Sequence, residues 1–93
     1  MLEKARDLTK RPELFRVLLH NDDYTSMDFV TAILETIFSK SPAEAHKVMM
    51  HVHQTGIGVA GIYTHEVAET KVTEVHELAH EAGYPLRASF EEE

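Results

Sequence analysis

The chain contains no cysteine, so disulfide bonds and metal sites built on thiolates are excluded. A cysteine-free chain also suits a reducing compartment. Long apolar runs are missing as well. No stretch approaches the ~20 apolar residues of a membrane span, and residues 1–15 lack an apolar run of signal-peptide length. We therefore expect a cytoplasmic protein that does not span a membrane.

Basic residues are scarce. The chain has 9 Lys and Arg against 16 Asp and Glu, which gives a formal net charge of −7. The nearest approach to a basic cluster is in the first residues of the chain, at Lys4, Arg6, Lys10 and Arg11. Nucleic acids and anionic membranes both require clustered positive charge, so the composition argues against either as a partner.

With 93 residues, the chain is long enough for one compact domain and too short for two. A domain of this size buries only about 60–65% of the surface of its unfolded chain. The core is therefore modest, and a shallow surface pocket is easier to build than an enclosed active site.

The first part of the chain predicts a tail, a strand and a turn. Residues 1–13 are polar and mixed in charge, which is typical of a flexible tail. Residues 14–20, LFRVLLH, form a short apolar run of strand length. Residues 21–26, NDDYTS, are turn formers, because Asn and Asp side chains bond to nearby backbone.

Two helices follow the turn. Apolar residues recur at helical spacing from Met27 and stop near Ser39, and Thr25 or Ser26 can cap the start. The next helix begins after Ser41, where a proline and then a glutamate form a capping signal, and it ends before Gly56.

The remaining elements are a strand, a helix and a strand. We expect a strand over 56–63, a helix between Thr64 and Gly83, an edge strand over 86–90 and a solvated acidic tail over 91–93. The order β-α-α-β-α-β predicts an α/β (α+β) fold, with a three-stranded sheet that packs its helices on one face.

The histidines offer little evidence for a metal site. His51 and His53 point in different directions on a helix, whereas His76 and His80, four residues apart, share a face. No third ligand lies near that pair in the sequence, so we interpret all of these histidines as surface residues and expect no metal or other cofactor.

A different use is suggested for several residues taken together. Methionines form adaptable walls around an apolar side chain, and Met27, Met49 and Met50 could serve in this way. Asn21 and Asp22 precede a helix, where their oxygens can accept hydrogen bonds from an ammonium group. Capture of the N-terminal amine of a peptide is one recognition mode that uses such groups.

Four segments of the chain resemble the ClpS family, the N-degron adaptors of ClpA-type AAA+ unfoldases. They are LHNDDYTSMDFV (19–30), MMHVHQTG (49–56), GIYTHEVAETKV (61–72) and YPL (84–86). They occur in the family's order, and the resemblance covers roughly residues 14–90, which we take as the adaptor domain.

The resemblance implies a three-stranded antiparallel sheet, no catalysis, and two partners. The first partner is any protein that begins with Leu, Phe, Tyr or Trp, and the second is the N-domain of a ClpA-type unfoldase. We expect a monomeric adaptor. By position, the resemblance implies amine binding by Asn21, Asp22 and His53. It implies a side-chain pocket lined by Thr25, Met27, Val30, Met49, Val52 and Leu86, and an unfoldase-facing surface with Glu66 and Lys71.

Two departures from the family pattern bear on function. Ser26 stands where the family usually has proline, which predicts a looser loop and altered selectivity, and the tail of about 13 residues is short for delivery. One alternative is a ClpS-like module that binds the unfoldase with a changed degron preference or as an inhibitor. Another is a small metal-dependent hydrolase that uses the histidines.

Overall fold

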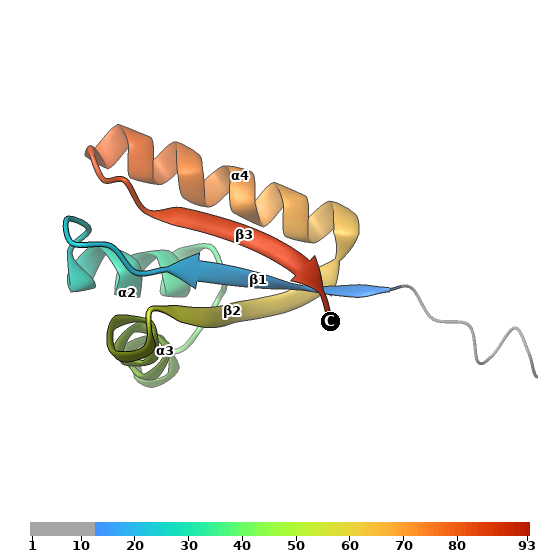
Figure 1. The fold of residues 1–93 in the computed structure, drawn as a ribbon, viewed down its shortest axis with the longest axis horizontal. Helices are drawn as coiled ribbons and strands as arrows, with labels where there is room; N and C mark the ends of the chain where they lie inside the picture. Colours follow the sequence, from blue (N-terminus) through green and yellow to red (C-terminus); the bar gives the residue numbers. More distant parts are fainter. Residues whose placement is uncertain (1–12) are drawn as a thin grey trace, which may run out of the picture.

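The structure is a computed structural model that describes residues 13–93. Its elements are β1 (Leu14–His20), α2 (Met27–Thr36), α3 (Pro42–Thr55), β2 (Ile57–Thr64), α4 (His65–Ala82) and β3 (Arg87–Glu92). The three strands form one antiparallel sheet in the order β2-β1-β3 (Figure 1). The predicted α+β fold and its order of elements are therefore confirmed. The predicted tail, residues 1–13, lies almost entirely outside the described residues.

The helices begin and end where short-range capping signals lie. Ser26 and Ser41 each accept a hydrogen bond from the backbone N–H three residues later, which gives α2 and α3 their starts. Gly56 and Gly83 end α3 and α4 in the left-handed conformation, with φ of 93° and 81°. The two serine caps explain why the starts of α2 and α3 matched the sequence prediction.

Three boundaries differ from the prediction. Helix α2 ends at Thr36, before the predicted end near Ser39, because Ser39 has a φ of 53° and turns the chain. Strand β2 starts at Ile57, because Gly56 serves the cap of α3. Strand β3 starts one residue late and runs to Glu92, so two of the three residues predicted as a solvated tail belong to the sheet.

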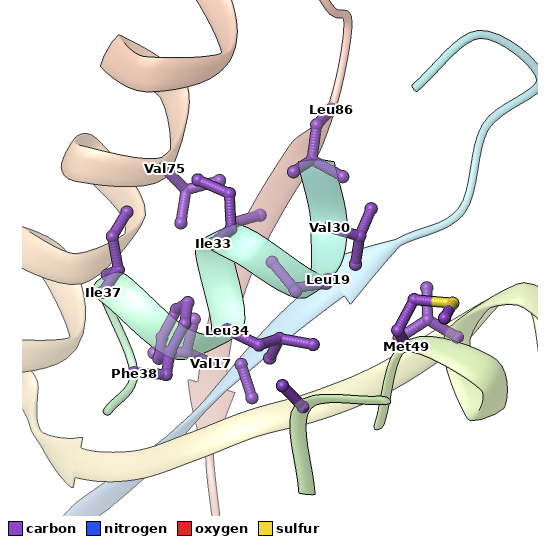
Figure 2. Close-up of a cluster of buried hydrophobic side chains, with 14 of the residues drawn as sticks. Val17, Leu19, Val30, Ile33, Leu34, Ile37, Phe38, Met49, Val75 and Leu86 are labelled. Atoms are coloured by element: carbon purple, nitrogen blue, oxygen red, sulfur yellow. The ribbon is translucent and has the colours of Figure 1, made fainter. Parts of the chain in front are cut away.

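The helices pack on the face of the sheet from which Val17 and Leu19 project (Figure 2). Helix α2 contributes Ile33 and Leu34 to this core, and both are at most 2% exposed. Burial of one such aliphatic side chain contributes about 1.5–3 kcal/mol. Helix α3 approaches β2 closely, since a side chain at Gly58 would collide with Val52.

The opposite face of the sheet carries the alternate residues of each strand. Across it, Arg16 lies opposite Ile62 and Glu91, and Leu18 lies opposite Val59. The pairing of β1 with β2 shifts by one residue between Val17 and Leu18, which leaves Ala60 as the extra residue of a bulge.

His20 ends β1 on this second face. Its Nε2 lies 2.7 Å from Ser89 Oγ, and Arg87 stands opposite it on β3. Burial, and after it the positive charge of Arg87, lower the pKa of His20 below its usual value. The unfolded chain therefore binds the proton more readily than the folded chain does.

We predict that the free energy of unfolding falls as the pH drops below about 6.5, the usual pKa of histidine, toward the lower pKa of folded His20. In His20→Gln, which cannot titrate, this part of the loss should be absent. Urea unfolding at several pH values between 7.5 and 5 measures it. An identical loss in wild type and His20→Gln would contradict the prediction.

Candidate functional site

The loop between β1 and α2 is organised by the carboxylate of Asp22. Its Oδ1 accepts hydrogen bonds from the backbone N–H groups of Tyr24 and Thr25, at 2.8 and 2.7 Å. Its Oδ2 accepts the hydroxyl hydrogen of Thr25 at 2.8 Å. Three of about four acceptor positions of the carboxylate are thus occupied within the loop.

These bonds also set the charge of Asp22. Burial acts to raise the pKa of Asp22, but the hydrogen bonds from Thr25 and Tyr24 stabilise the ionised form, and the pKa lies below its usual value. A fixed negative charge therefore stands at the end of the sheet, directly before α2.

Ser26 holds the other end of this loop. Its Oγ accepts a hydrogen bond from the N–H of Phe29 at 3.1 Å, and its φ of −69° lies within the range that proline would impose. The structure therefore gives no sign of the looser loop predicted from the absence of proline, because the serine cap restrains the same position.

Helix α3 is tied to this loop through its last turn. The N–H of Gly56 donates to the carbonyl of Val52 at 2.8 Å, and the carbonyl of Gly56 accepts the N–H of Asn21 at 2.9 Å. This second bond fixes the end of β1 against the end of α3. It thereby sets the distance between the loop and His53, which lies in the last turn of α3.

A cavity of about 370 Å³ lies between the loop, the start of α2 and the end of α3. Its size is at the low end of the ~300–1,000 Å³ typical of ligand pockets, which suits one side chain and its backbone. It is lined by Asn21, Asp22, Asp23, Tyr24, Thr25, Ser26, Met27, Val30, Met49, Val52 and His53. The cavity is called the end pocket below.

The end pocket has an apolar floor and a polar rim. Val30, Met49 and Val52 are 7%, 5% and 1% exposed, so the floor is continuous with the core. Met27 is 46% exposed and forms a lip. The rim carries the carboxylates of Asp22 and Asp23 and no Lys or Arg. The arrangement suits an apolar side chain attached to a positively charged group.

The structure brings together eight of the nine residues predicted for amine binding and the side-chain pocket. The exception is Leu86, which does not line the end pocket. It is 3% exposed and belongs to the buried cluster that supports α2 from the core (Figure 2). Met50, which the sequence grouped with Met27 and Met49, lines a different surface hollow beside Val59.

Apart from Ser26, two lining residues were not predicted as site residues. Asp23 and Tyr24 lie at the rim of the end pocket, and Tyr24 is 78% exposed. The signal in the sequence was their place inside NDDYT. Turn propensity alone does not reveal that this exposed aromatic side chain lies beside a pocket.

The two residues predicted to face an unfoldase lie on α4. Glu66 is exposed in the first turn of the helix. Lys71 donates from Nζ to the carbonyl of Ile37 at 2.7 Å, and the same atom lies 5.7 Å from the ring centroid of Tyr63. Lys71 thus caps the C-terminal end of α2 in addition to any role at the surface.

All seven histidines lie within the described residues. No group of three or more His, Cys, Asp or Glu side chains suited to a metal occurs among residues 13–93. The prediction that His76 is a solvated surface residue is incomplete, because its Nε2 accepts the backbone N–H of Ala88 at 3.0 Å.

Among residues 13–93, no helix is both long and apolar enough to cross a membrane.

Comparisons with known proteins identify the family of the chain. A family model described as ATP-dependent Clp protease adaptor protein ClpS matches residues 10–89. The ClpS adapter protein of Desulfotalea psychrophila is 60% identical over 85 residues, which is 91% of this chain and 83% of that protein. The ClpS adapter protein of Desulfatibacillum aliphaticivorans is 52% identical over 93 residues, 100% of this chain and 89% of that protein.

A solved structure shares the fold closely. The structure of Agrobacterium tumefaciens ClpS2 bound to L-phenylalaninamide matches with a TM-score of 0.85 and 42% sequence identity. The match covers 89% of this chain and 100% of the other.

The bonds to Asp22 make a prediction about Thr25. Thr25→Val keeps the side-chain shape but removes the hydroxyl donor, so the pKa of Asp22 should rise toward its usual value, and about 1–3 kcal/mol of stability at neutral pH should be lost. Because a lowered carboxyl pKa stabilises the fold only above that pKa, the variant should lose less stability on acidification below pH 4. Thr25→Ser, which keeps the donor, is the control.

An NMR titration of the Asp22 carboxyl in the three proteins measures this effect. The same pKa in wild type and Thr25→Val would show that the hydroxyl does not hold the carboxylate.

The bond between Gly56 and Asn21 makes a second prediction, and Gly83 offers a matched control. Both glycines end a helix with positive φ, and at both the space that a Cβ would enter is open, with no contact within 4 Å. Alanine at either position should therefore cost about 1–2 kcal/mol for the left-handed backbone. Only Gly56→Ala should move the amide resonances of residues 21–26 in NMR spectra. Equal movement of that loop in Gly83→Ala would refute the coupling.

Proposed function

The chain belongs to the ClpS family of ATP-dependent Clp protease adaptors, and from this premise we propose that its end pocket binds the free N-terminal residue of proteins destined for degradation. As a member of an adaptor family, the chain is not an enzyme. The N-terminal residues it takes are Leu, Phe, Tyr and Trp, and the receiving protein is a ClpA-type AAA+ unfoldase that works with the ClpP protease.

The observation that carries the proposal is the apolar floor beside an anionic rim. A free α-amine has a usual pKa near ~8 and is mostly protonated at neutral pH. The oxygens of Asn21 and Asp22 and a ring nitrogen of His53 stand at the rim to accept its hydrogens. An internal peptide segment has no α-ammonium group next to its side chain, so the rim favours chain ends.

The energetics require both halves of the pocket. Burial of a Leu- or Phe-sized side chain contributes about 1.5–3 kcal/mol, whereas micromolar affinity corresponds to about 8 kcal/mol. Charge-assisted hydrogen bonds of about 1.5–3 kcal/mol each supply much of the difference. L-phenylalaninamide, the ligand of the related Agrobacterium tumefaciens ClpS2, carries both of these groups and little else.

The arrangement of the molecule supports delivery as well as binding. The loop of the end pocket lies at one end of the sheet, and α4 begins at the other end (Figure 1). Glu66, which we propose faces the unfoldase, is in that first turn of α4. Substrate and unfoldase can therefore be held at once. Lys71, five residues further along α4, is the second residue proposed for this surface, and its Nζ also bonds to the carbonyl of Ile37.

We further propose that the adaptor works in the cytoplasm, which a cysteine-free chain suits. The alternative function, a ClpS-like module with changed degron preference or inhibitory action, is favoured by one feature, Ser26 in place of the usual proline. The φ of −69° at Ser26 weakens that argument, because the backbone is held as proline would hold it.

The test uses peptides that differ only at the first residue, with fluorescence anisotropy as the measurement. Peptides that begin with Leu or Phe should bind. Acetylation of the α-amine should weaken binding at least about 100-fold, because two charge-assisted hydrogen bonds are lost. His53→Ala should weaken binding, and His51→Ala, on the same helix but outside the end pocket, should not.

Equal affinity for free and acetylated peptides would contradict the proposal. A panel with all first residues separates the alternative function, since a changed preference would place residues other than Leu, Phe, Tyr and Trp at the top. Degradation of reporter proteins with the same first residues, by the unfoldase and protease together, distinguishes a delivering adaptor from an inhibitor.

A further inference from the structure

The face of the sheet opposite the helices carries an exposed apolar stripe. Ile57, Val59 and Ile62 of β2 are 40%, 40% and 45% exposed. On β1 they pair with His20, Leu18 and Arg16 in turn, and of these Leu18 is buried. Leu14, which lies on the same face of β1, is 42% exposed. Four of the eight exposed large hydrophobic residues of the described chain therefore gather on this face. Ile57, Val59 and Ile62 are called the β2 stripe below.

The β2 stripe has polar neighbours on both sides, because Val59 also lines a surface hollow with Glu44 and Lys47 of α3. Toward β3, Arg16 pairs with Glu91 at 3.2 Å, and His20 contacts Ser89 at 2.7 Å. Strand β2 itself, IGVAGIYT, contains no charged residue, although it is an edge of the sheet. Edge strands normally carry charges that prevent pairing with other chains, as β3 does with Arg87 and two glutamates. An uncharged edge strand with an apolar row is open to pairing with another chain.

The β2 stripe is continuous with the end pocket. Ile57 is paired with His20. Asn21 follows His20, Gly56 precedes Ile57, and the N–H of Asn21 donates to the carbonyl of Gly56 at 2.9 Å. Asn21 belongs to the rim of the pocket. A chain whose first residue fills the pocket therefore needs to pass only this one bonded pair to reach Ile57.

We propose that the β2 stripe binds the part of the substrate that follows its N-terminal residue, as an extended, uncharged and apolar segment. This inference rests on the proposed function of the end pocket. Ile57 and Ile62 are five residues apart, or roughly 16 Å along a strand. With about two residues to cross the rim, the stripe receives substrate residues 3 to 8.

The size of the β2 stripe favours this occupant over a second copy of the chain. Three aliphatic side chains that are 40–45% exposed offer roughly 200 Å² in total, well below the ~800 Å² per partner of a stable dimer. A small apolar contact becomes useful when its ligand is already held nearby, because tethering makes the second contact intramolecular. The end pocket supplies that tether. The net charge of −7 further disfavours an acidic segment here.

The experiment compares two peptide series that share the first two residues, Phe-Gly. One series alternates Ile and Ser over positions 3–8, and the other alternates Gly and Ser. In the wild-type protein the apolar series should bind about 10-fold more tightly in fluorescence anisotropy. In the double variant Val59→Ser, Ile62→Ser this difference should disappear. Val67→Ser, Leu78→Ser is the matched control, because both residues are similarly exposed on α4.

L-phenylalaninamide is measured with every variant, since it reaches only the end pocket. Its unchanged affinity in the double variant, together with loss of the 10-fold difference, supports the inference. Equal affinity of the two series in wild type, or a difference that persists in the double variant, overturns the inference and leaves the pocket intact. Failure of L-phenylalaninamide to bind the wild type overturns the proposed function itself. Self-association that Val59→Ser abolishes would assign the stripe to a second copy instead.

Discussion

The end pocket depends on one carboxylate. Asp22 accepts three hydrogen bonds from the two residues Tyr24 and Thr25, and so closes the turn that leads the chain from sheet to helix. The negative charge that the proposed ammonium ligand requires is the same charge that shapes the loop. The turn and the proposed recognition both favour the ionised form of Asp22, so the low pKa of this carboxyl would serve both.

The rest of the domain holds two walls at a fixed separation. Helix α2 starts at a serine cap and has the ammonium of Lys71 on the carbonyl of its C-cap residue, Ile37, so both of its ends have partners. Helix α3 ends at Gly56, whose carbonyl bonds to Asn21, the residue directly after the central strand β1. A pocket whose walls are fixed in this way loses little conformational entropy when a ligand enters, which favours affinity.

The sequence predicted those features that depend on neighbours along the chain. Serine caps, positive-φ glycines and helical spacing are local, and the element order followed from them. Leu86 stays a prediction, because the resemblance assigns it a position at the pocket and its side chain, 3% exposed, belongs to the core. The bond from Ala88 to His76 joins residues 12 apart and has no local signal. The strand over Glu91 and Glu92 was missed for the same reason, since charged residues become strand only through their pairing with β1.

The bulge at Ala60 has a consequence for how β2 is built. A regular strand over 57–64 would direct Tyr63 to the same face as Ile57 and Val59. The extra residue reverses the alternation, so Tyr63 packs with the core, while Ile62 joins the outer face. Odd-numbered residues therefore face outward before the bulge, and even-numbered residues face outward after it. Deletion of Ala60 would give a regular strand in which Ile62 still faces outward and Tyr63 still faces the core. Deletion of one residue after the bulge would instead turn each following side chain of β2 to the opposite face of the sheet.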